Sequence, residues 1–401
     1  MKFSLLGTDE TTIKLAHAIA ESRQQLSAVY QPAAGHLEQL RAWAPRIELA
    51  ESWQELLAEG MADVIIVARG QRDDRVEPLR LLLQTGIPVV VSHPVVPSML
   101  DYYELDMNRQ DGGGVVMPLV PACWHPAVEQ LRQMISESGP AGLGRVEQIV
   151  FDRQLQQRSK EQVLEHFVRD AELARLLAGE LTKVGAMALP GSEGGNREAD
   201  YSALGIQMSG PSGIVVRWSV RPVEDLPGVR ITVRGASGSA VLTAGDDERP
   251  WLLERRAEGQ SQQWEFDDWD EAADALARVV QAVDTGQVQP DWQDAARDME
   301  LADAIERSAH KGRTVDLYFE EHTEHGTFKG MMAAGGCALL MAALAMLVIA
   351  TTAVNWRIPL AEYWPYILVG VLGVFLLLQS LKLVFPGASA PPGESEPRQP
   401  R

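Results

Sequence analysis

The sequence predicts an α/β protein in three parts. A doubly wound parallel sheet comes first, then an α+β segment with a largely antiparallel open sheet, then a hairpin of two transmembrane helices. Three observations support this order. Strand and helix patterns alternate over residues 1–120, consecutive strand-like runs follow, and two long apolar runs lie near the C-terminus. Alternating strands and helices are typical of parallel sheets, whereas consecutive short strands joined by turns favour antiparallel sheets.

Buried parallel strands are the main expectation for residues 1–120. The continuous apolar runs ADVIIVA at 62–68 and IPVVV at 87–91 are typical of strands that are covered on both faces. The other elements expected here are strands at 2–6 and 25–30 and helices at 11–22, 36–43, 52–58 and 76–84.

The segment 121–325 changes to a run of strands enclosed by helices. We expect helices at 124–138, 162–178, 270–283 and 294–311, and strands at 145–151, 184–189, 201–208, 213–220, 229–233, 240–243 and 264–266. An antiparallel sheet with one uncovered face needs cover. The apolar residues of IVVRWSV at 214–220 therefore suggest a homo-oligomer that pairs through the open sheet.

Two apolar runs predict the membrane hairpin. Residues 331–354 carry no charged side chain, and residues 366–385 carry a single one, that of Lys382. A helix needs about 20 apolar residues to cross the hydrocarbon core, so each run is long enough to span a bilayer. A deeply buried helical hairpin in a soluble protein is the alternative. The tail at 386–401 is rich in Pro, Gly, Ser and Glu and is expected to be disordered.

Charge and cysteine content exclude some classes of function, and the N-terminus indicates where the part of the chain before the apolar runs is located. The net charge is −19, with 55 acidic and 36 basic residues, so nucleic acid is not an expected partner. Cys123 and Cys337 are too few for a disulfide framework, and no metal-ligand spacing occurs. The N-terminus begins with a strand-like run instead of a signal peptide. We therefore expect an inner (cytoplasmic) membrane protein whose body lies on the cytoplasmic side.

Six segments in a fixed order point to a known family. They are LLGTDETTIKLAHAIA, ESWQELLAEGMADVIIVA, LLLQTGIPVVVSHPV, WHPAVEQLRQMI with LGRVEQIVF, VRITVRGASGSAVL and DAARDMELADAIERSAHKGRTVDL. Their order resembles the Gfo/Idh/MocA family of NAD(P)-dependent oxidoreductases over about residues 1–320. The resemblance implies a Rossmann-like nucleotide-binding domain at 1–120, a substrate and dimerisation domain at 121–325, an NAD or NADP cofactor, and a sugar-like or polyol-like substrate.

The first turn of this fold departs from the dinucleotide fingerprint G-x-G-x-x-G. The aligned residues are Gly7, Asp9 and Thr12, with Thr8 inside the turn, so only the first glycine is present. Asp9 places a carboxylate where a diphosphate lies at a helix N-terminus. The alternative is that Asp9 or Thr11 only caps the helix.

Three further residues lie at cofactor positions. Gln31 takes the place of the ribose-binding acid, or is an ordinary loop residue. Arg69 follows the strand at 62–68 at the carboxyl edge of the sheet. It could meet a phosphate, pair with Asp9, or form a surface salt bridge. Pro94 ends the motif Ser92-His93-Pro94, which corresponds to the family's Glu-Lys-Pro.

The three catalytic positions also depart from the family. His93 stands at the lysine position, where it could act as an acid or base, or could be a satisfied loop residue. Glu165 and Arg169 stand at the positions of an Asp and a His that lie four residues apart on a helix. An ordinary i,i+4 salt bridge is the simpler interpretation of that pair, because Arg cannot act as a general base.

Two hypotheses of function remain open from the sequence. The first is a membrane-anchored NAD(P)-dependent oxidoreductase with an atypical site. The second is a catalytically inactive family member that acts as a membrane-tethered ligand-binding or scaffold protein. The fold favours the first, and the substitutions at the motif positions favour the second.

Overall fold

The computed structural model describes residues 1–137, 142–189, 200–224, 227–246, 250–257 and 259–317. The described residues belong to one compact unit. The predicted spans at 331–354 and 366–385 and the predicted disordered tail at 386–401 lie outside the described residues. Among the helices that are described, none is both long enough and apolar enough to cross a membrane.

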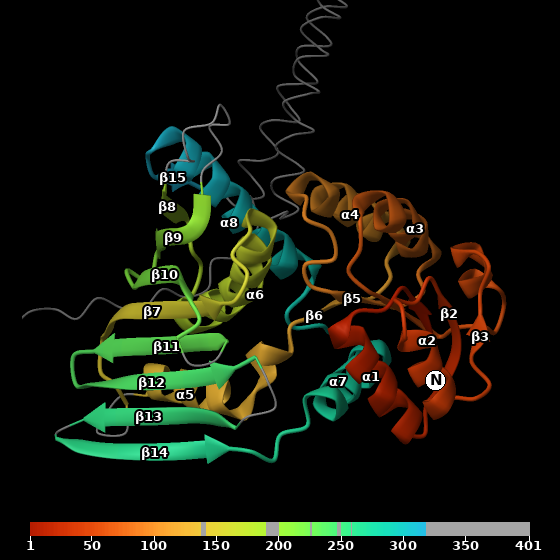
Figure 1. Ribbon diagram of the computed structural model, residues 1–401, viewed down its shortest axis with the longest axis horizontal. Helices are drawn as coiled ribbons and strands as arrows, with labels where there is room; N and C mark the ends of the chain where they lie inside the picture. Colours follow the sequence, from red (N-terminus) through yellow and green to blue (C-terminus); the bar gives the residue numbers. More distant parts are fainter. Residues whose placement is uncertain (138–141, 190–199, 225–226, 247–249, 258, 318–401) are drawn as a thin grey trace, which may run out of the picture. The chain divides into compact units, whose positions relative to one another are not determined.

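The first sheet is the predicted parallel sheet. Its strands are β1 (Lys2–Leu6), β2 (Gln25–Tyr30), β3 (Glu48–Leu49), β4 (Val64–Val67), β5 (Val89–Ser92) and β6 (Val116–Leu119). They run parallel in the order β3-β2-β1-β4-β5-β6 (Figure 1). The strand order reverses between β1 and β4, and such a switch point is where open α/β sheets bind ligands.

Helices cover both faces of the parallel sheet. One face packs on α1 (Glu10–Glu21), α2 (His36–Trp43) and α7 (Glu271–Thr285), and Figure 1 shows α1 and α7 side by side. The other face packs on α3 (Arg72–Thr85) and α4 (Met99–Gly112), with the short helix η1 (Trp53–Leu57) at the edge. Strands β4 and β5 are buried on both faces, and this burial explains their continuous apolar runs.

The second sheet is largely antiparallel, as predicted. It contains β7 (Val146–Leu155), β8 (Lys183–Leu189), β9 (Asp200–Ser209), β10 (Val215–Pro222), β11 (Gly228–Gly235), β12 (Gly238–Gly245), β13 (Trp251–Ala257), β14 (Gln260–Phe266) and β15 (Val315–Asp316). The order is β14-β13-β12-β11-β7-β10-β9-β8-β15, and among the described pairings only β7 and β10 are parallel.

One face of this second sheet is covered by helices. They are α5 (Pro126–Ser136), which follows the short helix η2 (Pro121–Trp124), α6 (Lys160–Ala178) and α8 (Trp292–Lys311) (Figure 1). Helix α8 also packs on α4 and β6, so it joins the two sheets. The buried residues of the second sheet and of the α3/α4 face of the first sheet accordingly form one core, whereas the face under α1, α2 and α7 has a separate core.

Three of the apolar residues of IVVRWSV do not line the uncovered face of the sheet. Val216, Trp218 and Val220 are buried, and the Trp218 ring meets Phe167 of α6 at 5.5 Å between ring centroids. Val215 alternates with them and is half-buried. The predicted apolar contact is therefore wrong for the three buried residues, which pack on the side of α6, and it stays a prediction for Val215. Pairing of two copies through the open sheet stays a prediction.

Candidate functional site at the carboxyl edge of the parallel sheet

The turn between β1 and α1 depends on a glycine. Gly7 has φ +75°, and a Cβ added there would lie 2.2 Å from Nη2 of Arg75. The Arg75 side chain is buried and its Nε donates a hydrogen bond to the Ala68 carbonyl at 2.8 Å. Burial lowers the pKa of Arg75, although the charges of Asp74 and Asp9 oppose that shift. The sequence identified Gly7, whereas its packing partner Arg75 was not anticipated.

Asp9 caps helix α1. Its Oδ1 accepts the Thr12 N–H at 2.8 Å, and the Asp9 N–H donates to Thr12 Oγ1 at 2.8 Å, which completes a capping box. Its Oδ2 accepts the backbone N–H of Arg69 at 2.8 Å. The carboxylate thus turns back to the amides of Thr12 in the first turn of α1 and of Arg69 after β4, which is the capping alternative left open by the sequence.

These residues do not fit the diphosphate of an NAD(P) cofactor in the usual cradle. The helix N-terminus that would receive the diphosphate already carries the negative charge of Asp9. Two amides that could donate to phosphate oxygens, those of Thr12 and Arg69, donate to Asp9 instead. The position of the third glycine holds the fully buried Thr12. Only the first glycine, Gly7, keeps the conformation that the fingerprint requires.

The loop after β2 closes against the same turn. Thr8 is buried, and its hydroxyl oxygen accepts the Ala33 N–H at 2.8 Å and lies 2.9 Å from Nδ1 of His36. Gln31, at the ribose position, is exposed and has φ +48°. Thr8 is therefore engaged by the chain's own loop, and Gln31 remains accessible from solvent.

Arg69, Glu165 and Arg169 meet at the carboxyl edge. Oε1 of Glu165 forms ion pairs with Nη1 of Arg69 and, at 3.0 Å, with Nη2 of Arg169. Arg69 Nε donates to the Pro94 carbonyl at 3.2 Å, and Arg169 Nε donates to the His93 carbonyl at 3.4 Å. The expected i,i+4 pair of Glu165 and Arg169 is present, and Arg69 adds a third member, which is the salt-bridge alternative left open for Arg69.

His93 lies away from solvent. Its side chain is fully buried, with Nδ1 at 3.1 Å from the Tyr102 hydroxyl and Nε2 at 3.4 Å from Oδ2 of Asp298. Burial lowers the pKa of His93 to about 4, so the imidazole is neutral at pH 7. Nδ1 is satisfied by the Tyr102 hydroxyl, whereas Nε2 is buried without a hydrogen-bond partner among the described residues. His93 is therefore a buried loop residue that is only partly satisfied, and its catalytic role stays a prediction.

A buried ionic cluster lies behind His93 and was not anticipated. Arg175 Nη1 pairs with Glu172 at 2.9 Å and with Asp298 at 3.2 Å, and its Nη2 pairs with Asp294 at 2.8 Å. Burial raises the pKa of Glu172 to about 9, with a further rise from the charge of Asp298. Burial also raises the pKa of Asp298 to about 7, against the attraction of Arg175. Glu172 and Arg175 lie on α6, whereas Asp294 and Asp298 lie on α8, so no local pattern connects the two halves of the cluster.

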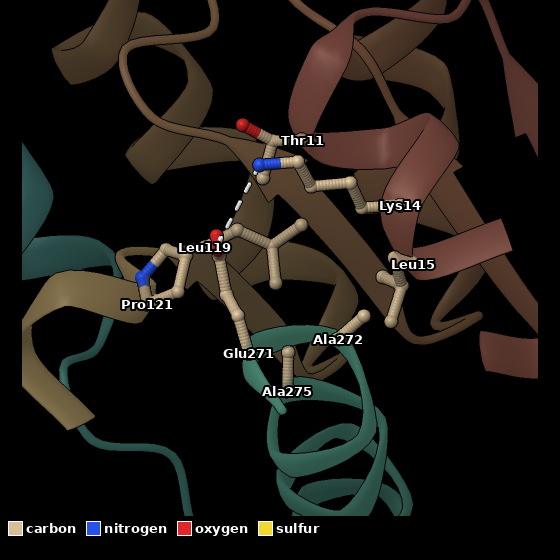
Figure 2. Close-up of a pocket in the computed structure, with 8 residues that line it drawn as sticks. All are labelled: Thr11, Lys14, Leu15, Leu119, Pro121, Glu271, Ala272 and Ala275. Atoms are coloured by element: carbon tan, nitrogen blue, oxygen red, sulfur yellow. Dashed lines mark ion pairs between the residues drawn. The ribbon is translucent and has the colours of Figure 1, made fainter. Parts of the chain in front are cut away.

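One pocket lies between the starts of α1 and α7, beside the end of β6, and is too small for a substrate. Figure 2 shows Lys14 of α1 and Glu271 of α7 paired across it, and their charged atoms are 3.8 Å apart. The other lining residues are Thr11, Leu15, Leu119, Pro121, Ala272 and Ala275. Its volume is about 10 Å³, which is room for roughly one water molecule.

Comparisons with known proteins agree with the fold. Residues 1–117 match the family model Gfo/Idh/MocA, described as "oxidoreductase family, NAD-binding Rossmann fold". No curated protein matches the chain. Among solved structures, a myo-inositol dehydrogenase from Corynebacterium glutamicum shares 20% identity with a TM-score of 0.62, covering 80% of this chain and 99% of its own.

Two further solved structures are similar over the same length. Aldose-aldose oxidoreductase from Caulobacter crescentus has 16% identity and a TM-score of 0.65, covering 79% of this chain and 99% of its own. An oxidoreductase from Agrobacterium radiobacter, in complex with NAD⁺, L-tartaric acid and magnesium, has 16% identity and a TM-score of 0.62, covering 79% and 98%. At such identities the likeness shows the fold alone. The resemblance to the Gfo/Idh/MocA oxidoreductases, with their NAD-binding Rossmann fold, is thus confirmed for residues 1–117, and the two-sheet fold for about four-fifths of the chain.

Proposed function

We propose that this chain is a Gfo/Idh/MocA-type protein that binds a small ligand at the carboxyl edge of its parallel sheet without transferring hydride. The Asp9 carboxylate supports this proposal most strongly, because it occupies the helix N-terminus that would hold a cofactor diphosphate. Two negative charges 4 Å apart repel by about 4 kcal/mol at an effective dielectric constant of 20. That repulsion corresponds to a loss of affinity of roughly a thousandfold.

The placement of the catalytic positions supports the same proposal. The imidazole of His93 is buried and neutral, so it offers no charge to a developing alkoxide. Glu165 and Arg169 are bound to each other, and the guanidinium of Arg169 cannot accept a proton. No step of hydride transfer is therefore assigned to these side chains.

The membrane segments belong to the same proposal. Residues 331–354 and 366–385 would anchor the protein in the inner membrane, with its body on the cytoplasmic side. The support comes from the length and uncharged character of the two runs. Tethering would keep a ligand-binding body close to other proteins of the same bilayer. Pairing of two copies through the second sheet would bring two sites into one assembly.

NAD(P)-dependent oxidation of a sugar or polyol is the second candidate. Two specific observations favour it: the match of residues 1–117 to an NAD-binding family model, and likeness to structures named as a myo-inositol dehydrogenase and an aldose-aldose oxidoreductase. The turn at Gly7 is retained and Gln31 is exposed, and both would suit a dinucleotide whose diphosphate lies away from the N-terminus of α1.

Titration of the full-length protein in detergent with NADH and NADPH separates the two candidates. We expect no change in nicotinamide fluorescence up to millimolar cofactor. The matched variants are Asp9→Asn, which removes the charge and keeps one cap acceptor, and Asp9→Gly, which also removes the Cβ. We expect binding to appear with Asp9→Asn and to strengthen with Asp9→Gly. Tight binding by the unchanged protein, followed by reduction of NAD⁺ with myo-inositol, would favour the oxidoreductase instead.

A further inference from the structure

Two arginines at the sheet edge are held side by side by consecutive carbonyls. Arg69 donates through Nε to Pro94 O at 3.2 Å, and Arg169 donates through Nε to His93 O at 3.4 Å. Arg69 follows β4, whereas Arg169 belongs to α6, so the two guanidiniums approach from different parts of the fold. Because His93 is buried, the carbonyls that anchor them belong to a well-packed segment.

Both guanidiniums converge on a single carboxylate oxygen. Oε1 of Glu165 is the ion-pair partner of both Arg69 and Arg169. All three side chains are partly exposed, at 28%, 27% and 37% for Arg69, Glu165 and Arg169 respectively. Two forked guanidiniums offer more donors than one oxygen can use, and they match the geometry of a bidentate carboxylate or phosphate.

The local charge at this edge differs from that of the whole protein. The chain has a net charge of −19, whereas among the described residues here Arg69 and Arg169 share Glu165 as their ion-pair partner. The Asp9 carboxylate nearby keeps its charge, but it is turned to the backbone amides of Thr12 and Arg69 and is not an ion-pair partner of either guanidinium. Two guanidiniums that share one oxygen, at the edge where parallel sheets bind ligands, favour an anionic ligand that adds acceptors.

We propose that Arg69 and Arg169 form a binding site for a small organic anion, a carboxylate or a phosphate ester, and that Glu165 occupies this site until the ligand displaces it. The inference rests on the proposed ligand-binding function and names the class of ligand. Ion pairs that are exposed to this degree stabilise the fold little, so displacing Glu165 costs a ligand little free energy. A ligand anion that bridges both guanidiniums replaces one shared oxygen with two or more acceptors.

A purely structural salt bridge makes the opposite prediction for Glu165. If the three side chains only hold α6 against the end of β4, removing Glu165 weakens the fold and creates no affinity. If Glu165 stands in for a ligand, its removal leaves two guanidiniums without an anion, and affinity for an added anion increases. The sign of the effect of one substitution therefore distinguishes the two roles.

Calorimetric titration of the full-length protein in detergent, at low ionic strength, provides the test. The probes are D-gluconate for the carboxylate, D-glucose 6-phosphate for the phosphate ester, and neutral D-glucose as the matched control. We expect heat of binding with at least one of the anions and none with D-glucose. D-Glucose is the matched control of D-glucose 6-phosphate, which differs from it only at C6, and D-glucuronate, the C6 carboxylate of the same ring, completes the set. The C6 group that binds more tightly shows whether the site prefers a carboxylate or a phosphate ester.

The variants are Glu165→Gln, Arg169→Met, Arg69→Met and the control Arg278→Met. Glu165→Gln is expected to tighten anion binding by about threefold, since it releases a weak ion pair. Arg169→Met or Arg69→Met is expected to weaken it by about tenfold or more, because each removes a charge-assisted hydrogen-bond donor. Arg278 forms an i,i+4 pair with Asp274 at 2.9 Å on α7 and should leave the affinity unchanged.

Each outcome decides the inference separately from the proposed function. Absence of anion binding by the unchanged protein and by Glu165→Gln, with both proteins folded by circular dichroism, overturns the inference. Equal binding of D-glucose, or an equal loss with Arg278→Met, also overturns it. The proposed function fails by a different result, namely NAD(P)H binding and turnover by the unchanged protein, and that result does not depend on the anion titration.

Discussion

The buried carboxyl of Glu172 should make the protein less stable as the pH rises above neutral. Burial raises its pKa in the folded protein to about 9, against 4.5 for an ordinary Glu. The folded state therefore holds this proton more tightly than the unfolded state does. The resulting stability is fully present below pH 4.5 and is lost as the pH rises toward 9.

The change in the free energy of unfolding can be worked out above pH 7, where Glu172 is the main one of the two carboxyls that still titrates. The pKa of Asp298 is raised to about 7, so its own contribution is largely lost by that pH. One pH unit corresponds to about 1.4 kcal/mol for one proton. Between pH 7 and pH 8.5 the free energy of unfolding should therefore fall by about 2 kcal/mol. Glu172→Gln removes the titrating group and still offers an acceptor to Arg175, so this slope should disappear.

Urea unfolding followed by tryptophan fluorescence, at pH 7, 7.75 and 8.5, measures the slope. Glu147→Gln is the matched control, because Glu147 is exposed on β7 and its substitution changes the net charge by the same amount. The control should keep the slope of the unchanged protein. Parallel pH profiles for the unchanged protein and Glu172→Gln would contradict the reasoning, as would a stability that rises with pH in this window.

Three further substitutions test separate parts of the fold. Gly7→Ala should lower the free energy of unfolding by about 3 kcal/mol, because φ is +75° and the new Cβ meets Arg75; a change below about 0.5 kcal/mol in urea unfolding would contradict this. Thr8→Val removes the acceptor of the Ala33 N–H, so the Ala33 amide should exchange faster with solvent, and unchanged protection would show that the loop is held otherwise. Trp218→Phe removes an indole N–H that donates to a buried carboxylate at 2.8 Å and should cost about 1–3 kcal/mol; an unchanged thermal midpoint would exclude this role.

The strands of the parallel sheet were predictable because burial on both faces leaves a direct trace in the sequence. The strands at 2–6 and 25–30 were predicted with their observed bounds, and the run at 62–68 contains β4. Strand β6 and helix α4 were missed. Pro118 lies inside β6 and argues against a strand, but β6 is the edge strand of the sheet, where a missing N–H is tolerated. The helical pattern of α4 is weak because buried Asp101 and Asp106 interrupt its apolar side.

The helix expected at 124–138 illustrates how one residue moves a boundary. The structure has the short helix η2 at Pro121–Trp124 and then α5 from Pro126. Proline disfavours a helical conformation in the residue before it, so His125 is extended and becomes the N-cap. Strand β13 was also missed, because the charged residues of WLLERRA obscure its alternation at the periphery of the second sheet.

Local features of the candidate site could be inferred from sequence spacing alone. Asp9 with Thr12 forms the cap, and Glu165 with Arg169 forms the i,i+4 pair, because both relations span a single helical turn. The glycine at position 7 has the left-handed conformation that a tight strand-to-helix turn requires. These contacts depend on residues close together in the chain.

Only the tertiary structure decided which charges meet and which are buried. Arg69 reaches Glu165, and His93 lies against Asp298, through contacts between elements far apart in the sequence. The continuous apolar runs indicated the parallel sheet and the consecutive strand-like runs indicated the second, since each pattern records burial of side chains along a single element. The protonation of His93, Glu172 and Asp298 depends instead on the loss of water around them, and that loss arises only when α6, α8 and the end of β5 pack together.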